Sequence, residues 1–279
     1  MVSLSNHFKN VTLSLGLFLS FNIFSEKFID FMKASEHFNS ECLYNKNWKN
    51  IQTTFDNFID NITVSKSSRI PKIIHQIWLG GPFPERYKTL QNSWIKNHPD
   101  WTYILWTDES VERFGLKNKA LYNKAKNLGE RSDIVRYEVL ERFGGLYIDT
   151  DFECIKSFDI LHHICDFYTS VGYGPDPVIL CGLIGSVPAH PILKACIETM
   201  KRKDSEKDSF TDILNRTSIF HFTKCFLNNY TKSSIAFPVT FFYPLPDCAR
   251  NSKLKNYLKP ESFAVHHWHL SWNNGKIGD

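Results

Sequence analysis

Short apolar runs alternate with helical patterns through the middle of the chain. The apolar runs are rich in β-branched and aromatic residues and end in turn residues, which predicts buried strands. They cover residues 73–79, 101–106 and 146–148. Apolar residues spaced three and four apart predict helices over 86–97, 119–128 and 132–142. This alternation predicts an α/β fold with a mostly parallel sheet and helices on both of its faces.

The boundaries of these elements rest on glycine, proline and small polar residues. Gly129 is expected to end the helix over 119–128, and Ser132 to cap the helix that follows. From Pro175 onward prolines and glycines interrupt the apolar runs, which predicts loops and short strands. An edge strand is predicted over 237–244, because its prolines cannot join a central ladder.

The N-terminal part of the chain has a different pattern. Residues 11–24 are apolar but fewer than the roughly twenty that span a bilayer. Two interpretations stay open: a signal or signal-anchor segment, or a helix that touches a membrane or packs on the protein. Residues 26–62 carry an amphipathic helical pattern, and the serine-rich stretch 65–68 is typical of a linker. We therefore expect an N-terminal segment and helical stem over 1–65 and a main domain over 66–279.

Composition narrows the class of protein. The 279 residues are 42% hydrophobic and 22% charged, which is typical of a globular chain with one sizeable core. A net charge of +4 without a dense block of Lys or Arg argues against a nucleic-acid partner. The seven cysteines are odd in number and form no C-x-x-C pair, so buried free thiols are expected rather than structural zinc or a disulfide framework.

Two carboxylates end the apolar run that follows Gly144 and Gly145. Asp149 and Asp151 are two residues apart, and side chains at that spacing in an extended segment share a face. Two like charges that close raise each other's pKa unless a cation compensates them. A hard divalent ion does so, and its remaining positions can hold phosphate oxygens. The pair predicts a metal–diphosphate site, although a strand end with one capping and one solvated Asp is the plainer alternative.

Other polar or aromatic residues follow the ends of the neighbouring strands. Trp78 lies at the end of the first predicted strand, Asp108 follows the second, and the Asp pair follows the third. In open sheets of this kind ligands bind outside the carboxyl ends of the strands. Trp78 is either a core residue or a platform on which a base stacks. Asp133 and Arg136 share a helix face and are either an ion pair or a sugar-binding pair.

The C-terminal run 263–272 is rich in histidine and tryptophan. His266, His267 and His269 bring too few spaced ligands for a closed zinc site. We instead expect this tail to act as a lid that contributes hydrogen-bond donors to an anionic ligand.

The order of these motifs resembles glycosyltransferase family 32, the sugar-binding DXD glycosyltransferases. That family includes α-1,6-mannosyltransferases, lipid-linked sugar transferases and capsular polysaccharide enzymes, and the catalytic domain of the clostridial glucosylating toxins is similar. The motifs that carry the resemblance are IIHQIWLGG (73–81), WTD (106–108), RSDIVRY (131–137), GGLYIDTD (144–151), and the HW and SW pairs at 267–268 and 271–272. The similarity extends over about residues 70 to 272, and the first 65 residues lie outside it.

The resemblance implies a GT-A-like, Rossmann-type fold and a UDP- or GDP-sugar donor. It also implies Mn²⁺ or Mg²⁺ as cofactor and transfer with retention at the anomeric carbon. Asp133 and Arg136 would hold the donor sugar, Asp149 would contact the ribose or a metal-bound water, and Asp151 would bind the metal. No carboxylate nucleophile stands out in the sequence. This favours attack by the acceptor on the same face of the sugar from which the leaving group departs, over a double displacement.

The same resemblance assigns the donor-binding residues. Trp78 would stack on the base, Tyr147 would lie beside the diphosphate or sugar, and Ser271 and Trp272 would close over the diphosphate. Asp108 is included because it follows the strand next to that of Trp78.

Several alternatives stay open. Many relatives carry Asn where this chain has Cys181, so an inactive nucleotide-sugar-binding protein is one of them. A metal-dependent phosphohydrolase would need more ligands than the sequence places. The acceptor is a glycan, a lipid or, in a toxin-like enzyme, a host protein. We expect a membrane-associated location, with a secreted or cytoplasmic one as the alternatives.

Overall fold

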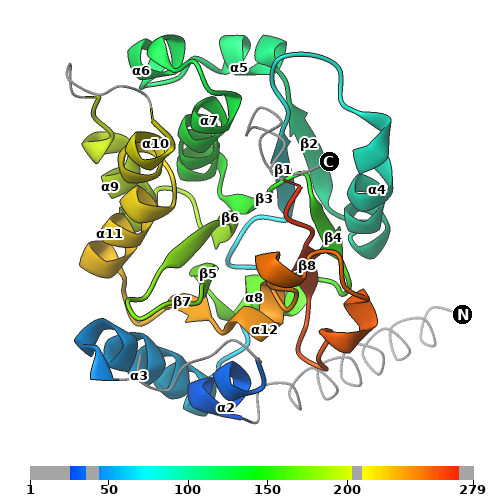
Figure 1. Ribbon diagram of the computed structural model, residues 1–279, viewed down its shortest axis with the longest axis vertical. Coiled ribbons are helices and arrows are strands. Elements are labelled where there is room, and N and C mark those ends of the chain that lie inside the picture. Colours follow the sequence, from blue (N-terminus) through cyan, green and yellow to red (C-terminus); the bar gives the residue numbers. More distant parts are fainter. Residues whose placement is uncertain (1–25, 36–43, 203–208, 270–279) are drawn as a thin grey trace, which may run out of the picture.

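A six-stranded sheet lies at the centre of the molecule (Figure 1). The computed structural model describes residues 26–35, 44–202 and 209–269. The strands lie in the order β2-β1-β3-β6-β5-β7. Their bounds, in that order, are Thr102–Trp106, Ile73–Ile77, Gly145–Ile148, Ile179–Ser186, Phe167–Val171 and Ser234–Phe237.

The sheet is mostly parallel, as predicted, and its one reversed strand shapes the site. Three of the five strand pairs are parallel, and β6 runs antiparallel to both β3 and β5. Leu183 of β6 therefore pairs with Ile148 at the end of β3, and the Gly182 carbonyl accepts a hydrogen bond from the backbone N–H of Asp149. The reversal places the first half of β6 directly beside the acidic segment.

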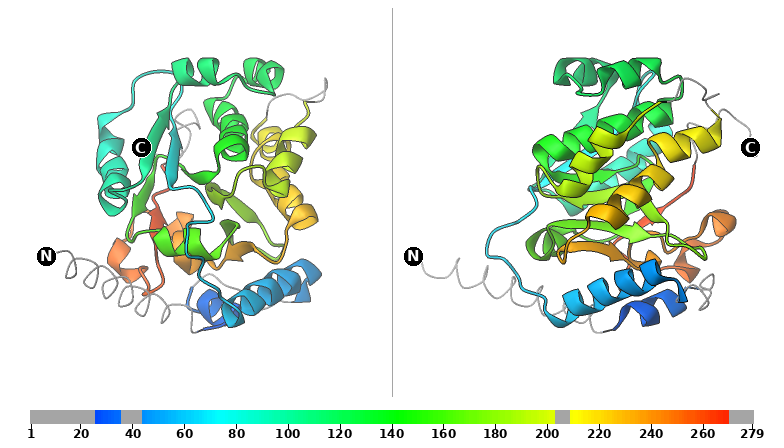
Figure 2. Two further views of the ribbon diagram at one scale, coloured as in Figure 1. Left: turned by 180° about the vertical axis from the view of Figure 1, so that it is seen from behind. Right: turned by 90° about the vertical axis from the view of Figure 1, so that its left-hand side faces the viewer.

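Helices flank the sheet. Along one side, α7 (Leu128–Phe143), α9 (Pro191–Thr199) and α11 (Ile219–Asn229) lie next to one another (Figure 2). Elsewhere α4 (Lys88–Asn97) packs on β4 (Phe152–Cys154), which forms a separate two-stranded antiparallel sheet with β8 (Ala264–His266). The other α-helices are α2 (Phe28–Lys33), α3 (Lys46–Asp60), α5 (Asp108–Phe114), α6 (Lys119–Lys124), α8 (Asp159–Ile164), α10 (Phe210–Arg216) and α12 (Val239–Phe242). The 3₁₀ turns within the described residues are η3 (Glu85–Tyr87), η4 (Asp247–Ala249) and η5 (Leu254–Asn256).

The predicted boundary between the second and third helices is wrong. The third helix, α7, begins at Leu128, because the Asn127 side chain accepts hydrogen bonds from the N–H groups of Gly129 and Glu130 at 2.7 and 3.2 Å. Gly129 therefore lies in the first turn of α7 and does not end α6. Ser132 lies within the helix and does not cap it.

The prediction of loops and short strands after Pro175 is also wrong. Three helices, α9 to α11, and the eight-residue strand β6 occupy this region. His190 caps α9 and Pro191 follows at its first position, where the missing N–H costs nothing. Residues 237–244 do not form a strand, because β7 ends at Phe237 and Pro238 begins the short helix α12.

The first two helices in the described part of the chain, α2 and α3, pack on the far edge of the sheet. Trp48, Ile51 and Phe55 of α3 are buried, as its amphipathic pattern predicts, and the ring of Phe55 lies 5.7 Å from that of Phe237 in β7. Figure 1 shows α2 and α3 beside β7 and α12. The apolar run 11–24 lies outside the described residues. Among the helices within the described ranges, none has the length and apolar character needed to cross a membrane.

Candidate active site

A cavity of about 380 Å³ opens where β1 and β3 end. Residues from both halves of the chain line it. The residues singled out from the sequence that do so are Trp78, Asp133, Arg136, Tyr147, Asp149 and Asp151. Asp108 is not among the lining residues, and Ser271 and Trp272 lie outside the described residues.

Asp149 and Asp151 converge for a different reason from the predicted one. The strand β3 ends at Ile148, and the two aspartates belong to the turn that leads into β4. The N–H of Phe152 closes this turn on the carbonyl of Asp149 at 3.3 Å. The side chains meet because the turn brings them round, not because they alternate along a strand. They nevertheless offer ligand atoms within 4.8 Å of one another and of His266.

His266 completes this group, which we call the acidic triad (Asp149, Asp151 and His266). It lies opposite Phe152 in the β4–β8 pair, and its Nε2 is 3.0 Å from Oδ1 of Asp151. The sequence did not single out His266 as a partner of the aspartates, because only the pairing of two short strands far apart in the chain brings it there. Two carboxylates and an imidazole form a donor set that suits a divalent cation.

Burial and charge act in opposite directions within the acidic triad. Burial raises the pKa of Asp149, in spite of Arg136 nearby. Burial would also raise the pKa of Asp151, but His266 and the N–H of His269, which donates to Oδ2 at 2.9 Å, outweigh it and hold the pKa at about 2. The pKa of His266 is raised, because the attraction of Asp151 exceeds the cost of burial. The attraction between His266 and Asp151 thus favours the charged form of each group.

The C-terminal tail donates to the acidic triad as well. The N–H of His267 donates to the carbonyl of Asp151 at 3.0 Å, and Nε2 of His267 lies 3.0 Å from Glu153. The described part of the tail thus supplies hydrogen-bond donors to Asp151. The predicted lid over an anionic ligand covers residues 263–272, of which 270–272 lie outside the described residues.

Asp133 and Arg136 are an ion pair that also faces the cavity. Their side chains approach to 2.9 Å, and Arg136 donates to the carbonyl of Cys181 at 2.7 Å and lies 3.5 Å from Asp149. Burial raises the pKa of Asp133 to about 6 and outweighs the attraction of Arg136. Both interpretations of this pair therefore agree with the geometry, and the sugar-binding role stays a prediction.

Arg136 is fixed by more than its charge partners. Its guanidinium carbon lies 4.6 Å from the centre of the Tyr147 ring, and the Tyr147 hydroxyl donates to Asp149 at 2.6 Å. Within the described part of the chain its buried Nε has no hydrogen-bond partner. A buried donor without a partner costs free energy, and a ligand oxygen in the cavity would satisfy it.

Tyr243 is a cavity residue that the sequence did not indicate. Its hydroxyl is buried and has no hydrogen-bond partner among the described residues. Gly182 lies between it and the acidic triad. A Cβ at Gly182 would lie 2.7 Å from Oδ2 of Asp149 and 3.0 Å from the Tyr243 hydroxyl. Glycine at this position keeps the space between Asp149 and Tyr243 open. The only sequence signal for this part of the cavity was Cys181, which stands directly before Gly182 where many relatives carry Asn.

Trp78 and Asp108 form the rim of the site. Trp78 is partly exposed, and its ring lies 5.8 Å from that of Phe83 and 5.4 Å from that of Tyr87. Asp108 accepts a hydrogen bond from the N–H of Gly80 at 2.8 Å. Gly80 has a φ of 81°, so this bond fixes the turn that follows Trp78. Asp108 therefore acts on the cavity through the loop and not by lining it.

The opposite wall of the cavity is apolar. Its side chains come from the start of α7 and from α10 and the start of α11, namely Leu128, Phe210, Ile213, Leu214 and Ile219. Leu128 and Phe210 are 38% and 49% exposed, so apolar surface lies open beside the polar groups of the cavity. Cys181 also faces the cavity, and burial raises the pKa of its thiol to about 12, so it remains neutral.

Residues 84–168 match the family model of the glycosyltransferase sugar-binding region containing the DXD motif. The chain therefore contains a region similar to the sugar-binding region of DXD glycosyltransferases. The DXD region includes Asp133, Arg136, Asp149 and Asp151, whereas Trp78 and His266 lie outside the matched residues.

Curated proteins that are similar to this chain include mannosyltransferases and another glycosyltransferase. Inositol phosphoceramide mannosyltransferases 3 and 2 of Schizosaccharomyces pombe are 34% and 38% identical over 53% and 50% of this chain. The matches cover 42% and 41% of those two proteins, less than half their length. An uncharacterised glycosyltransferase, L373 of Acanthamoeba polyphaga mimivirus, is 28% identical over 73% of this chain and 84% of its own length.

A solved structure shares the fold. The PaToxG glycosyltransferase superposes with a TM-score of 0.51 at 18% identity and covers 66% of this chain and 79% of its own. The chain therefore has the GT-A-like arrangement expected from its sequence.

Proposed function

We propose that this protein is a metal-dependent, retaining glycosyltransferase that moves a hexose from a nucleotide-diphosphate sugar to an acceptor. The observation that carries the proposal is the acidic triad at the ends of β3 and β8, on the wall of a cavity that also holds the Asp133–Arg136 pair. Mannose is the sugar that we put first, since two of the relatives named above are mannosyltransferases.

Asp149, Asp151 and His266 would hold the ion. Mg²⁺ prefers oxygen ligands in a near-ideal octahedron, whereas Mn²⁺ accepts an imidazole nitrogen more readily, so we favour Mn²⁺. When bound, the ion supplies positive charge that offsets the charge of the departing diphosphate. His266 would bind the ion through a ring nitrogen that carries no proton, so binding of the ion would displace any proton from that nitrogen.

Other side chains that line the cavity would bind the sugar, the phosphates and the base of the donor. The unpartnered Nε of Arg136 and the Tyr243 hydroxyl are buried donors, which would serve oxygens of the sugar or phosphate. Asp133 would accept from sugar hydroxyls, and the partly exposed Trp78 would stack on the base. No covalent sugar intermediate is required, because the acceptor attacks from the face that the diphosphate leaves.

The apolar wall supports a lipid as the acceptor, with its polar head at the acidic triad. Leu128 and Phe210 expose apolar surface beside the catalytic groups, where a glycan would leave it uncovered. The names of the fungal relatives also include a ceramide lipid. The apolar run 11–24 would bring such an enzyme to a membrane. Two outcomes would displace this proposal. One is transfer to a glycan or a protein, and the other is binding of the donor without turnover.

Thermal unfolding of the full chain tests the donor and metal together. UDP- and GDP-sugars are added in turn, with Mn²⁺ or with chelator. A ligand at a hundred times its dissociation constant adds about 2.7 kcal/mol to the free energy of unfolding, a clear rise in Tm. The stabilisation should need Mn²⁺ and vanish in Asp151→Ala, while exposed Glu109→Gln keeps it. No response to any nucleotide would contradict the transferase function.

The acceptor is then tested with the donor that binds. Radiolabelled sugar is offered with inositol-phosphate lipids in detergent micelles and, in parallel, with oligosaccharides. Transfer to the lipid alone supports the proposed acceptor. Donor hydrolysis without transfer to either would indicate that the acceptor is of another class.

A further inference from the structure

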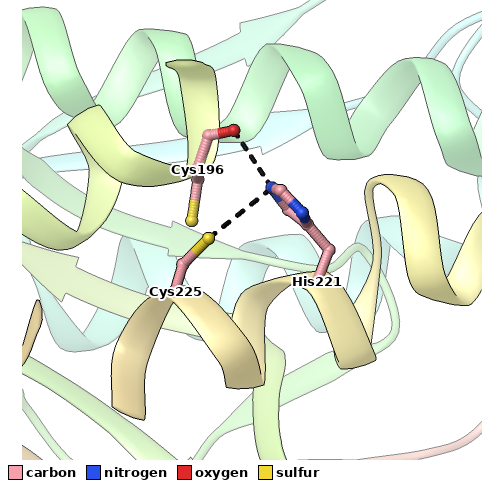
Figure 3. A group of neighbouring side chains, drawn as sticks. All are labelled: Cys196, His221 and Cys225. Atoms are coloured by element: carbon pink, nitrogen blue, oxygen red, sulfur yellow. Dashed lines mark hydrogen bonds between the residues drawn. The ribbon is translucent and has the colours of Figure 1, made fainter. Parts of the chain in front are cut away.

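A second group of ligand-type side chains lies between α9 and α11, away from the cavity. It consists of Cys196, His221 and Cys225, which we call the thiol cluster (Figure 3). All three residues are buried, and each offers one ligand atom within 4.8 Å of the other two. The proposed sugar transfer uses none of them.

Helix geometry explains why these residues meet. His221 and Cys225 are four residues apart on α11, so they lie one above the other on the same face. Cys196 comes from α9, the helix that packs against that face. Thr199 is one turn further along α9, and its hydroxyl lies 3.5 Å from Sγ of Cys225. Figure 3 shows the two sulfurs and the His221 ring pointing toward one another.

The separations fit a tetrahedral ion. Zn–S and Zn–N bonds of about 2.3 and 2.0 Å place neighbouring sulfur and nitrogen ligands about 3.5 Å apart. In the structure Sγ of Cys225 is 3.8 Å from Nε2 of His221. The same Nε2 lies 3.0 Å from the carbonyl of Cys196, to which it would donate when protonated. An ion would take the place of that proton with a small rotation of the ring.

We propose that the thiol cluster binds one Zn²⁺ ion through Cys196, His221 and Cys225, with water or the Thr199 hydroxyl in the fourth position. This site goes beyond the proposed sugar transfer. Thiolates select soft or borderline ions and not Mn²⁺ or Mg²⁺, so the two sites would not compete for one metal. The ion would fasten α9 to α11, which packs on β6 and therefore supports the cavity wall.

Cobalt substitution tests the site directly. The full chain, kept reduced, is stripped with chelator and loaded with Co²⁺ or Zn²⁺. A thiolate-to-cobalt charge-transfer band should appear, and one zinc per chain should be retained on dialysis and raise Tm. Because only thiolates produce that band, cobalt at the acidic triad does not interfere.

Variants assign the ligands. Cys196→Ser and Cys225→Ser should lose the band and the rise in Tm with zinc. Asp151→Asn, which damages the acidic triad, and Cys248→Ser, which alters an exposed thiol, should keep both. If a cluster variant does not fold, the spectrum of the unaltered chain still decides.

Two results would overturn the proposal. One is an unaltered chain that shows no thiolate band and no zinc beyond that lost in Asp151→Asn. The other is a Cys196–Cys225 disulfide in protein purified without reductant, whose reduced form takes up no zinc.

Discussion

The acidic triad and the thiol cluster gather the same number of ligand-type side chains within the same 4.8 Å, yet they suit different tasks. The acidic triad lines a cavity of about 380 Å³ and offers mainly oxygen, which suits a hard ion that shares its coordination with a substrate. The thiol cluster is enclosed by two helices and offers mainly sulfur, which suits an ion that stays in place. Because of these differences in donor type and in access to solvent, we propose a catalytic role for the acidic triad and a structural one for the thiol cluster.

The two groups also differ in what surrounds them. Around the acidic triad Arg136 and Tyr243 carry buried donors without partners among the described residues, so this region is incomplete without a ligand. In the thiol cluster, by contrast, Nε2 of His221 has partners, since it contacts Sγ of Cys225 and the carbonyl of Cys196. The unpartnered donors of Arg136 and Tyr243 thus support the proposal that substrate binds in the cavity.

The largest predicted effect separates the two groups. Asp151→Asn keeps the shape of the side chain but removes the charge that attracts the ion, and should lower kcat about a thousandfold. The measurement is steady-state sugar transfer with saturating donor and Mn²⁺. Thiolate-to-cobalt absorption should be unchanged. Equal loss of both signals would show that the variant had unfolded instead.

Protonation of His75 should give the next largest effect, a fall in the free energy of unfolding. His75 is buried in β1, accepts from Nε1 of Trp106 at Nδ1 (3.1 Å) and donates from Nε2 to the Gly144 carbonyl (2.9 Å). Because Trp106 can only donate, the ring must stay neutral, and burial lowers its pKa to about 4. Between pH 6.5 and 4 the unfolded chain binds the proton more readily, so the free energy of unfolding should fall by about 3 kcal/mol as pH decreases.

Urea unfolding at several pH values measures this loss. Since other buried histidines such as His190 also have lowered pKa values, the informative quantity is the difference from His75→Gln. That variant should be less stable at pH 7 but should show a shallower dependence on pH. Parallel curves for the two proteins would assign the pH dependence to other groups.

Gly182→Ala tests the space between Asp149 and Tyr243. The new methyl group would lie 2.7 Å from Oδ2 of Asp149 and must displace it. Displacement of a metal ligand typically lowers affinity about 10- to 100-fold, measured here as Mn²⁺ binding by calorimetry. Gly172→Ala is the matched control, because its methyl group would press only on the flexible end of Leu180 at 3.2 Å and would lie at ordinary contact distance, 3.5 Å, from the Val178 carbonyl. Unchanged Mn²⁺ affinity in Gly182→Ala would place the metal elsewhere.

Tyr243→Phe should give the smallest effect. It removes one hydroxyl that has no protein partner in the described structure, so stability should not fall. If the hydroxyl donates to the sugar nucleotide, the dissociation constant of the donor should rise about tenfold, or about 1.4 kcal/mol. Tyr230→Phe, at the end of α11, serves as the control. A rise in stability without any change in donor binding would leave the hydroxyl outside the site.

The sequence by itself determined the local parts of this protein. The period of apolar residues identified β1, β2, β3 and the amphipathic α3, since such patterns depend only on neighbours along the chain. The Asp pair after Gly144 and Gly145 located the acidic end of β3, and the order of motifs indicated the DXD region. The predicted start of α7 at Ser132 was wrong, because the side chain of Asn127 caps the helix one turn earlier.

Tertiary structure alone decided how distant parts meet. His266 reaches Asp151 through the β4–β8 register, and the reversal of β6 brings Gly182 beside Asp149. The thiol cluster exists only because α9 packs on α11. Periodicity records which face of an element is buried but not which element covers it. That choice depends on the packing of the whole core, so the residues that complete both groups could not be named in advance.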